Sequence, residues 1–281
     1  METLELKNPE FGTEAIGNKL ADLVSLRKER TNPLVAAGHM DHDIGIMFMF
    51  QAKKGVLSNS GAASKLVNPF LNSYSVDIST FETLFKTFSP QGKGIKFEFI
   101  FISQQDYIKY TGSTNVSTGA TEFLYFVATP LDHNDSAMGH YIIFNLGHKF
   151  EASMDFISSE ERRTLHDNYL SSQFYSNMNA YRAPLMQAEG IYYTWADINK
   201  ILNERNIDGR LYKEVQFFLG EVIELDIIRE YFRDNPYYVF DDVAYAAAYG
   251  GNEKRLTTIG KYLPDDLVGK EVFFDMGSLY P

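Results

Sequence analysis

The sequence contains no cysteine, and this absence excludes two kinds of chemistry. Neither a disulfide nor a thiolate nucleophile can form, so any metal site must use nitrogen and oxygen ligands. The sequence also lacks an apolar run of transmembrane length, and its first residues contain no basic segment followed by an apolar one. We therefore expect a cytoplasmic protein that carries no secretory signal and has no membrane as a partner.

Positive charge is also scarce, because 26 Lys and Arg residues are set against 37 Asp and Glu residues, giving a formal net charge of -11. Lys53–Lys54 and Arg162–Arg163 are basic pairs that extend no further. Proteins that bind nucleic acid or anionic membranes rely on clustered Lys and Arg. The composition therefore argues against nucleic acid and favours a protein partner or self-association.

Aromatic residues are abundant by contrast, since 22 Phe and 18 Tyr accompany a single Trp. Within the run Ile95–Ile102, phenylalanine recurs at every second position, which is the period of a β-strand. The runs Phe123–Ala128 and Tyr141–Phe144 have the same aromatic and β-branched character, and Pro130 is expected to end the strand before it. These three runs predict a mostly antiparallel sheet.

Several other segments take their predicted structure from local signals. The apolar run Ile44–Phe50 is interpreted as a further buried strand, and residues 52–68 and 111–121 as loops. Residues 13–30 and 79–88 have the spacing of amphipathic helices. A loop as long as 111–121 is often functional or disordered, and the sequence favours neither.

After residue 150 the spacing of apolar residues changes to threes and fours, which is typical of helices. Ser158 and Glu161 have the pattern of a capping box, and a broad apolar stripe from Leu211 to Phe232 predicts the longest helix. The acid pair Asp241–Asp242 is interpreted as a helix cap rather than as a catalytic pair.

We therefore expect an α+β protein, in which a mostly antiparallel, aromatic-rich sheet in the N-terminal half packs against a helical C-terminal half. The expected parts are a β-rich half over residues 1–150 and an α-helical half over residues 151–281. Because no Pro- or Ser-rich linker separates them, the two halves are expected to form one compact unit.

One cluster has the residue types of a metal site. His39, Asp41 and His42 could place two or three ligands around a divalent ion such as zinc. His133 and His140, near the ends of two predicted strands, would extend the site if those ends meet the cluster. A metal-dependent hydrolase would use Asp41 as a ligand or as a base for metal-bound water. The alternative is that these are turn residues and hydrogen-bonded histidines, with no cofactor.

Tyrosines gather in the C-terminal third, where they exceed what the local core needs. Tyrosine is favoured at protein interfaces because it combines apolar area with a polar tip. We therefore expect a non-enzymatic binding or assembly protein, with a metal-dependent hydrolase as the alternative and an enzyme of scattered residues as a third reading. Core packing is the alternative for any one tyrosine. The candidate contact residues are Tyr237, Tyr238, Tyr245, Tyr249 and Tyr262.

A resemblance to known sequences rests on three parts of the chain. The first joins Gly94–Phe99 with Glu122–Asp132, the second joins Ser158–Tyr169 with Tyr193–Leu202, and the third is Phe274–Pro281. These parts resemble a loose group of small uncharacterised bacterial proteins, from which this sequence departs by lacking a cysteine near its C-terminus. The resemblance implies no activity, cofactor or site residue.

Overall fold

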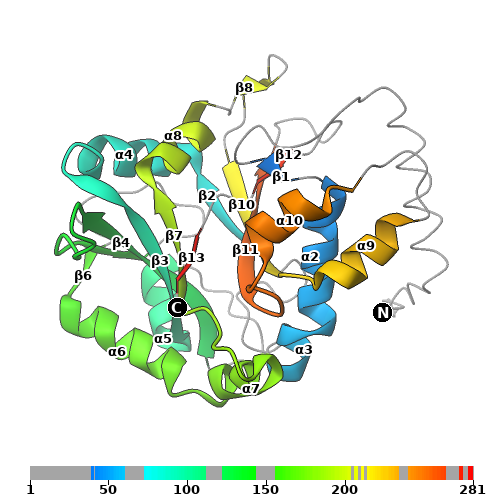
Figure 1. Cartoon of the computed structure of the whole chain (residues 1–281). Helices are drawn as coiled ribbons and strands as arrows, with labels where there is room; N and C mark the ends of the chain where they lie inside the picture. The colour runs from blue at the N-terminus through cyan, green and yellow to red at the C-terminus, as the bar shows by residue number, and fades with distance from the viewer. Residues whose placement is uncertain are drawn as a thin grey trace, which may run out of the picture.

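The protein belongs to the α+β class, with helices packed on antiparallel sheets (Figure 1). Within the residues that the structure describes, no helix is both long and apolar enough to span a membrane. The helix expected over residues 13–30 and most of the loop expected over 111–121 lie outside those residues. The computed structural model describes residues 39–40, 42–60, 73–111, 122–143, 156–203, 206–207, 210–211, 214–233, 240–263, 272–274 and 278–280.

The larger sheet has six antiparallel strands and is built around β3 (Gly92–Ser103) and β4 (Glu122–Asp132). These two strands pair along nearly their whole length, and both are buried except at their ends. The predicted aromatic strands are therefore confirmed. The strand order is β13 (Ser278–Tyr280), β7 (Gly190–Thr194), β3, β4, β5 (Tyr141–Ile143) and β6 (Phe156–Ile157).

The expectation that Pro130 ends its strand is wrong, because β4 continues to Asp132. Proline lacks only the N–H group, and its carbonyl can still join a ladder. The Pro130 carbonyl accepts a hydrogen bond of 3.0 Å from the Met138 N–H in the turn that follows.

The smaller sheet has five antiparallel strands, and it combines the two halves of the chain. Two of its strands precede residue 78, whereas the other three follow residue 213, so the expected division into a β-rich half and an α-helical half is not the observed arrangement. The strand order is β1 (His39–Met40), β12 (Val272–Phe274), β11 (Leu256–Leu263), β10 (Glu214–Glu221) and β2 (Ser73–Asp77). A short hairpin, β8 (Asn206–Ile207) and β9 (Arg210–Leu211), stands apart.

The long helix expected from Leu211 to Phe232 is wrong in its first part. That part is β10, and only the second part is helical, as α9 (Leu225–Arg233). In β10 every second side chain from Val215 to Leu219 is buried, which is the period of a strand. Because the strand and the helix follow each other closely, their apolar residues merge into a stripe with apparent helical spacing. Residues Leu256–Leu263 also form a strand, β11, which pairs with β10.

The expected strand Ile44–Phe50 is also wrong, since it lies in α2 (His42–Lys54). A short apolar run cannot be assigned to a strand or a buried helix from periodicity alone. In the structure Phe48 and Ala52, four residues apart, are fully buried on one face of the helix. The next helix, α3 (Val56–Ser60), replaces the start of the loop expected over residues 52–68.

The helices with a polar cap in the sequence are confirmed. The Ser158 hydroxyl accepts a hydrogen bond from Glu161 N–H at the start of α6 (Ser159–Leu170), and Asp241 caps α10 (Asp242–Tyr249). The helix expected over 79–88 is α4 (Ile78–Phe88). The remaining helices are α5 (Gln104–Thr111), α7 (Gln173–Arg182) and α8 (Trp195–Asn203).

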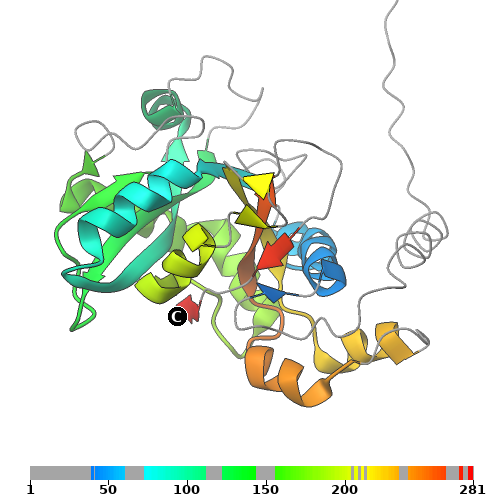
Figure 2. The ribbon, with the colours of Figure 1, turned by 90° about the horizontal axis from the view of Figure 1, so that it is seen from above.

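Two apolar cores lie between the layers of the molecule. The larger core lies between the two sheets and includes Phe97 of β3 and Phe217 of β10, whose rings are 6.3 Å apart. The smaller core lies on the other face of the five-stranded sheet, where Phe48 of α2 and Tyr245 of α10 pack. Figure 2 shows the five-stranded sheet between the six-stranded sheet and α2, with α9 and α10 along one side.

Candidate functional site

The residues proposed for a metal site fall into two groups on different sheets. His39 is part of β1 and pairs with Phe274 in the five-stranded sheet. His133 and His140 are exposed in the segment that joins β4 to β5 of the six-stranded sheet, and the His140 ring lies 5.2 Å from the Phe88 ring. Within the described residues no three His, Asp or Glu side chains gather as a metal site would require.

The rest of that site lies beyond what the structure describes, since Asp41 and the side chains of His39 and His42 are outside it. The metal site and the hydrolase reading built on it therefore stay predictions.

The tyrosines proposed as a contact surface also divide. Tyr245 is 5 % exposed, and its hydroxyl donates a 2.7 Å hydrogen bond to the Ile223 carbonyl, so it is a core residue rather than a contact residue. Tyr249 is half-buried and packs on Phe48 with ring centroids 5.2 Å apart. Tyr237, Tyr238 and the side chain of Tyr262 lie outside the described residues.

The opposite face of α10 is exposed and apolar. Val243 is 79 % exposed, the largest exposed fraction among the large apolar side chains of the described residues. Ala246, Ala247 and Gly250 are also exposed. They follow Val243 by three, four and seven residues, which places them on the same side of the helix. The only charged residue of α10 is Asp242, which accepts a 2.7 Å hydrogen bond from Arg229 of α9. The Asp242 side chain is 42 % exposed, so the charge of this helix is confined to its first residue.

A second exposed apolar segment adjoins the end of α10. Residues 183–186, Ala-Pro-Leu-Met, are all exposed, with Leu185 at 50 % and Met186 at 60 %. The guanidinium of Arg182, itself buried, donates hydrogen bonds to the carbonyls of Met186, Gly251 and Glu253. One side chain thus fastens the segment after α7 to the turn after α10. We call Val243, Ala246, Ala247, Gly250, Leu185 and Met186 the α10 surface.

A buried ionic cluster joins α6 to the six-stranded sheet. Glu98 of β3 is 1 % exposed. Arg162 donates to both of its carboxylate oxygens, Lys96 Nζ is 2.9 Å from one, and Thr129 donates at 3.1 Å to the other. Burial alone would raise the pKa of Glu98, but the bonds and charges of Arg162 and Lys96 outweigh it, and the pKa lies below its ordinary value.

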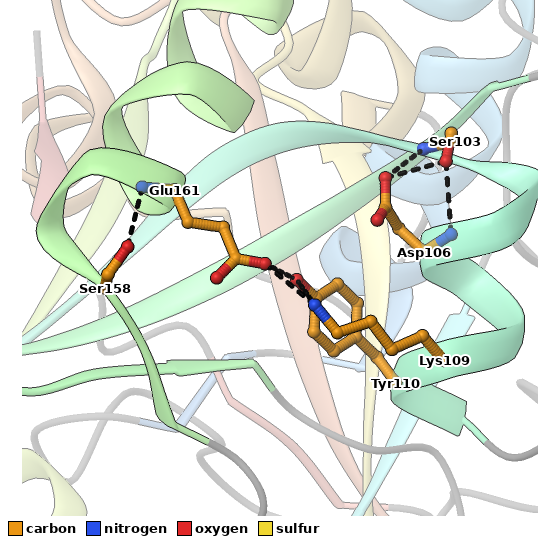
Figure 3. A network of polar contacts seen from close by, with 6 residues as sticks. All are labelled: Ser103, Asp106, Lys109, Tyr110, Ser158 and Glu161. Carbon is orange, nitrogen blue, oxygen red and sulfur yellow. Dashed lines mark hydrogen bonds and ion pairs between the residues drawn. The ribbon is translucent and has the colours of Figure 1, made fainter.

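A neighbouring cluster joins α6 to α5. Figure 3 shows Glu161 pointing from the start of α6 toward Tyr110 and Lys109 at the end of α5. The Tyr110 hydroxyl donates to Glu161 Oε1, and Lys109 Nζ lies 3.0 Å from the same oxygen. Burial and the Glu161 carboxylate raise the pKa of Tyr110, so its phenol stays protonated. The cluster therefore holds the two helices together and supplies no free base.

A third buried acid sits at the end of β10. Glu221 is 1 % exposed and accepts three hydrogen bonds: 2.6 Å from Val56 N–H, 2.9 Å from the Tyr181 hydroxyl and 3.3 Å from Gln51 Nε2. All three donors are uncharged, so burial dominates and raises the pKa of Glu221. Burial and this carboxylate raise the pKa of Tyr181 to about 12. A raised pKa is a mark of functional acids, but these donors already surround the carboxylate.

A cavity of about 30 Å³ lies between the two sheets. Its walls are aromatic or aliphatic except for Thr258, and Tyr74 and Tyr193 direct their hydroxyls to Leu124 O and Thr258. Ligand sites are typically several hundred Å³, so this space is a gap in core packing rather than a substrate site.

The α10 surface is the feature that sequence reasoning missed. Two signals for it were present in the sequence: α10 lacks the polar face of a surface helix, and Ala183–Met186 is an uninterrupted apolar run. No family model, no curated protein and no solved structure matches this chain. The function is therefore argued from the geometry of the described residues.

Proposed function

We propose that this protein is a non-enzymatic binding protein that assembles with a protein partner through the α10 surface, self-association being the simplest case. The observation that carries the proposal is that α10 is apolar on both sides. Tyr245 packs into the core on one side, whereas Val243 is exposed on the other. A helix that is apolar all round is normally covered on all sides. A second protein surface would provide the missing cover.

The energetics of the exposed side chains support this reading. Fully burying a valine, leucine or methionine side chain contributes roughly 1.5 to 3 kcal/mol. Val243, Leu185 and Met186 are half or more exposed, and Arg182 ties the segment that holds Leu185 and Met186 to the turn after α10. A preformed apolar surface of this kind needs little ordering when a partner binds.

The composition supports a protein as the partner. The formal net charge of -11 disfavours nucleic acid, and a cysteine-free chain suits the cytoplasm. In this proposal the side chains of Tyr245 and Tyr249 pack on Phe48 and hold α10 against the core. Tyr237, Tyr238 and Tyr262 stay candidate contact residues.

The test is to substitute Val243→Arg and to compare the size of the native complex, by sedimentation velocity, for purified protein and for extract of the cells that make it. A buried arginine in an apolar interface is strongly unfavourable, so we expect at least a roughly tenfold weaker assembly. Ile108→Arg is the matched control, because Ile108 is an exposed apolar residue of α5, far along the chain from α10. It should leave assembly unchanged.

The proposal fails if the unaltered protein sediments as a 32.0 kDa monomer in both settings. It also fails if Val243→Arg and Ile108→Arg affect assembly equally.

A further inference from the structure

Four polar residues from four separate parts of the chain meet beside the start of β7. Glu189, the residue before β7, has a side chain that is 32 % exposed. His166 of α6, Tyr175 of α7 and Arg255, the residue before β11, are buried. We call these four residues the Glu189 cluster. It contains one acid and three side chains that can each donate a hydrogen bond to that acid.

The backbone of Phe99 in β3 fixes two members of the cluster. Its N–H donates a 2.9 Å hydrogen bond to the Glu189 carbonyl, and its own carbonyl lies 2.9 Å from His166 Nδ1. A carbonyl can only accept, so Nδ1 carries the proton of this hydrogen bond. The His166 ring and the Glu189 backbone are therefore held by one residue, which leaves the Glu189 side chain as the part that can turn.

The other ring nitrogen of His166 faces the Glu189 carboxylate. Nε2 and Oε2 are 3.8 Å apart, which is too far for a hydrogen bond. In a neutral imidazole with its proton on Nδ1, Nε2 is an acceptor, so neither of the two facing atoms supplies a proton. A proton on Nε2 would provide both a donor and a positive charge. The carboxylate would then be drawn to this nitrogen.

Two buried donors near the same carboxylate lack a partner. Among the described residues only four buried polar side-chain atoms make no hydrogen bond, and the Tyr175 hydroxyl and Arg255 Nε are two of them. Arg255 Nη1 is bonded, at 3.1 Å, to Asn252 Oδ1. A buried donor without a partner costs free energy, so both groups favour a carboxylate that turns toward them.

The electrostatics of these two donors place Glu189 within reach of both. Burial raises the pKa of Tyr175 and the Glu189 carboxylate raises it further, so the phenol keeps its proton and stays a donor. Burial and the charge of Arg182 lower the pKa of Arg255 to about 10, and Glu189 opposes that fall. Arg255 therefore stays charged at neutral pH.

We propose that Glu189 is the moving part of a pH-sensitive switch. Its carboxylate binds His166 when that imidazole is protonated, and it binds the Tyr175 hydroxyl and Arg255 Nε when the imidazole is neutral. Glu189 leads into the six-stranded sheet, whereas Arg255 leads into β11 of the five-stranded sheet. The switch therefore makes one link between the two sheets depend on pH. It involves none of the residues of the α10 surface and goes beyond the proposed function.

The other charged or titratable side chains around the cluster act elsewhere. The charge of Glu253 acts on Arg182, and Arg163 and Asp167 of α6 are exposed. Histidine is the side chain that ordinarily changes its charge near neutral pH, so His166 is the member of this region that drives the switch. The side chains with partners of their own are Lys96, Glu98 and Arg162 in the buried ionic cluster, Tyr169 on the Ala188 carbonyl, Tyr181 on Glu221, Arg182 on three backbone carbonyls, and Lys254 on Glu224.

The test is an NMR titration of the imidazole signals between roughly pH 5 and 8. His166 is identified by the signal that His166→Gln removes. Glu189→Gln removes the anion that stabilises the imidazolium, so the midpoint of the His166 titration should fall by about one pH unit. Tyr175→Phe removes a competing donor without changing any charge. The carboxylate then reaches protonated His166 more easily, and the midpoint should rise by about half a pH unit.

Tyr181→Phe is the matched control, because Tyr181 is also a tyrosine of α7 but donates to Glu221. It should leave the His166 titration unchanged. A second measurement follows the ring carbon that carries the Tyr175 hydroxyl. In the unaltered protein its signal should move with the same midpoint as His166, and in Glu189→Gln this movement should disappear. Far-UV circular dichroism confirms that each variant is folded.

Three results would overturn the switch. One is a His166 signal that does not titrate over this range. Another is a midpoint that Tyr175→Phe leaves unchanged or lowers, which would make Glu189 a fixed neighbour of His166. The third is a Tyr175 signal that does not follow the His166 titration, which would show that the hydroxyl never binds the carboxylate.

Discussion

Glu98 and Glu221 are two carboxylates with the same burial and opposite surroundings. Each is 1 % exposed, and each ties a helix to a strand. Glu98 receives its bonds from Arg162 and Lys96, whereas Glu221 receives them from a backbone amide, a phenol and a side-chain amide. Burial raises the pKa of both, but only Glu98 has cations that reverse the shift. The sign of the partner charge, and not the depth of burial, separates them.

This difference predicts opposite effects on stability. The folded state favours ionised Glu98, so this acid stabilises the fold at neutral pH. The folded state disfavours ionised Glu221, so ionisation of that acid opposes folding at neutral pH. The predictions below test this contrast.

The largest effect is expected from Arg162→Met, which leaves Glu98 buried with only Lys96 as a cationic partner. Removing one member of a buried ion pair destabilises strongly because the other charge stays in the apolar interior. We expect a loss of about 3 kcal/mol in the free energy of unfolding, measured by urea denaturation. Arg163→Met is the control, since Arg163 is the exposed neighbour and should change stability by less than about 0.5 kcal/mol. Similar values for both variants would show that the Glu98 pair contributes nothing.

The next effect is expected at Gly55, whose missing side chain makes room for Glu221. A Cβ at this position would overlap Glu221 Oε2 and lie 2.6 Å from the Tyr181 hydroxyl. Overpacking of this kind costs roughly 1 to 3 kcal/mol, so Gly55→Ala should destabilise by that amount. In the background of Glu221→Ala the carboxylate is absent and only the Tyr181 hydroxyl stays close to the added Cβ, so the same change should then cost less. An equal cost in both backgrounds would contradict this explanation of the glycine.

The free energy of unfolding should change with pH in opposite directions for the two acids. Glu98 has a lowered pKa, so its contribution is present above its ordinary pKa and is lost as the pH falls through the folded value. Glu221 has a raised pKa, so its contribution is present below its ordinary pKa and is lost as the pH rises through the folded value.

Urea unfolding between pH 3.5 and 7.5 measures this difference. The unaltered protein should lose stability as the pH rises above the ordinary carboxyl pKa, and Glu221→Gln should abolish that loss. Glu98→Met combined with Arg162→Met should remove a fall on the acidic side. Matching pH profiles for these variants and the unaltered protein would reject the assignment.

The smallest effect is expected from Tyr181→Phe, which removes one of the three donors to Glu221. A single hydrogen bond of this kind contributes about 1 kcal/mol. The variant should lose about that much stability, and the pKa of Glu221 should rise further because the Tyr181 bond lowers it. The carbonyl-carbon chemical shift of Glu221 against pH measures the pKa directly. A fall in that pKa would mean that Tyr181 does not act as a donor.

Local signals predicted a large part of the fold. The alternation of Phe97, Phe99 and Phe101 predicted β3, and the Ser158 and Asp241 caps predicted two helix starts, because these patterns depend on neighbours in sequence. The assignments that failed depend on distant partners. Ile44–Phe50 becomes helical because Phe48 packs under α10, and β10 becomes a strand because β2 and β11 lie on its two sides.

The candidate α10 surface was not predicted from the sequence. An interaction surface in the C-terminal third was expected from its tyrosines, but Tyr245 proved to be core. Tyrosine identity alone does not report exposure, since its phenol can bond to a backbone carbonyl inside a core. The missing charges on the outward side of α10 were the more direct signal, and they gain meaning only once the helix limits are known.

The strand order of the five-stranded sheet has a consequence for synthesis on the ribosome. β2 pairs with β10, and β1 pairs with β12. The partner of each early strand is therefore synthesised in the last part of the chain. Ribosomes add roughly 5 to 20 residues per second, so β2 emerges on the order of ten seconds before β10. During that interval its backbone edge is open to other nascent chains. A chain released before residue 214 lacks β10, the partner of β2. Such a chain would expose the unpaired edge of β2 to chaperones.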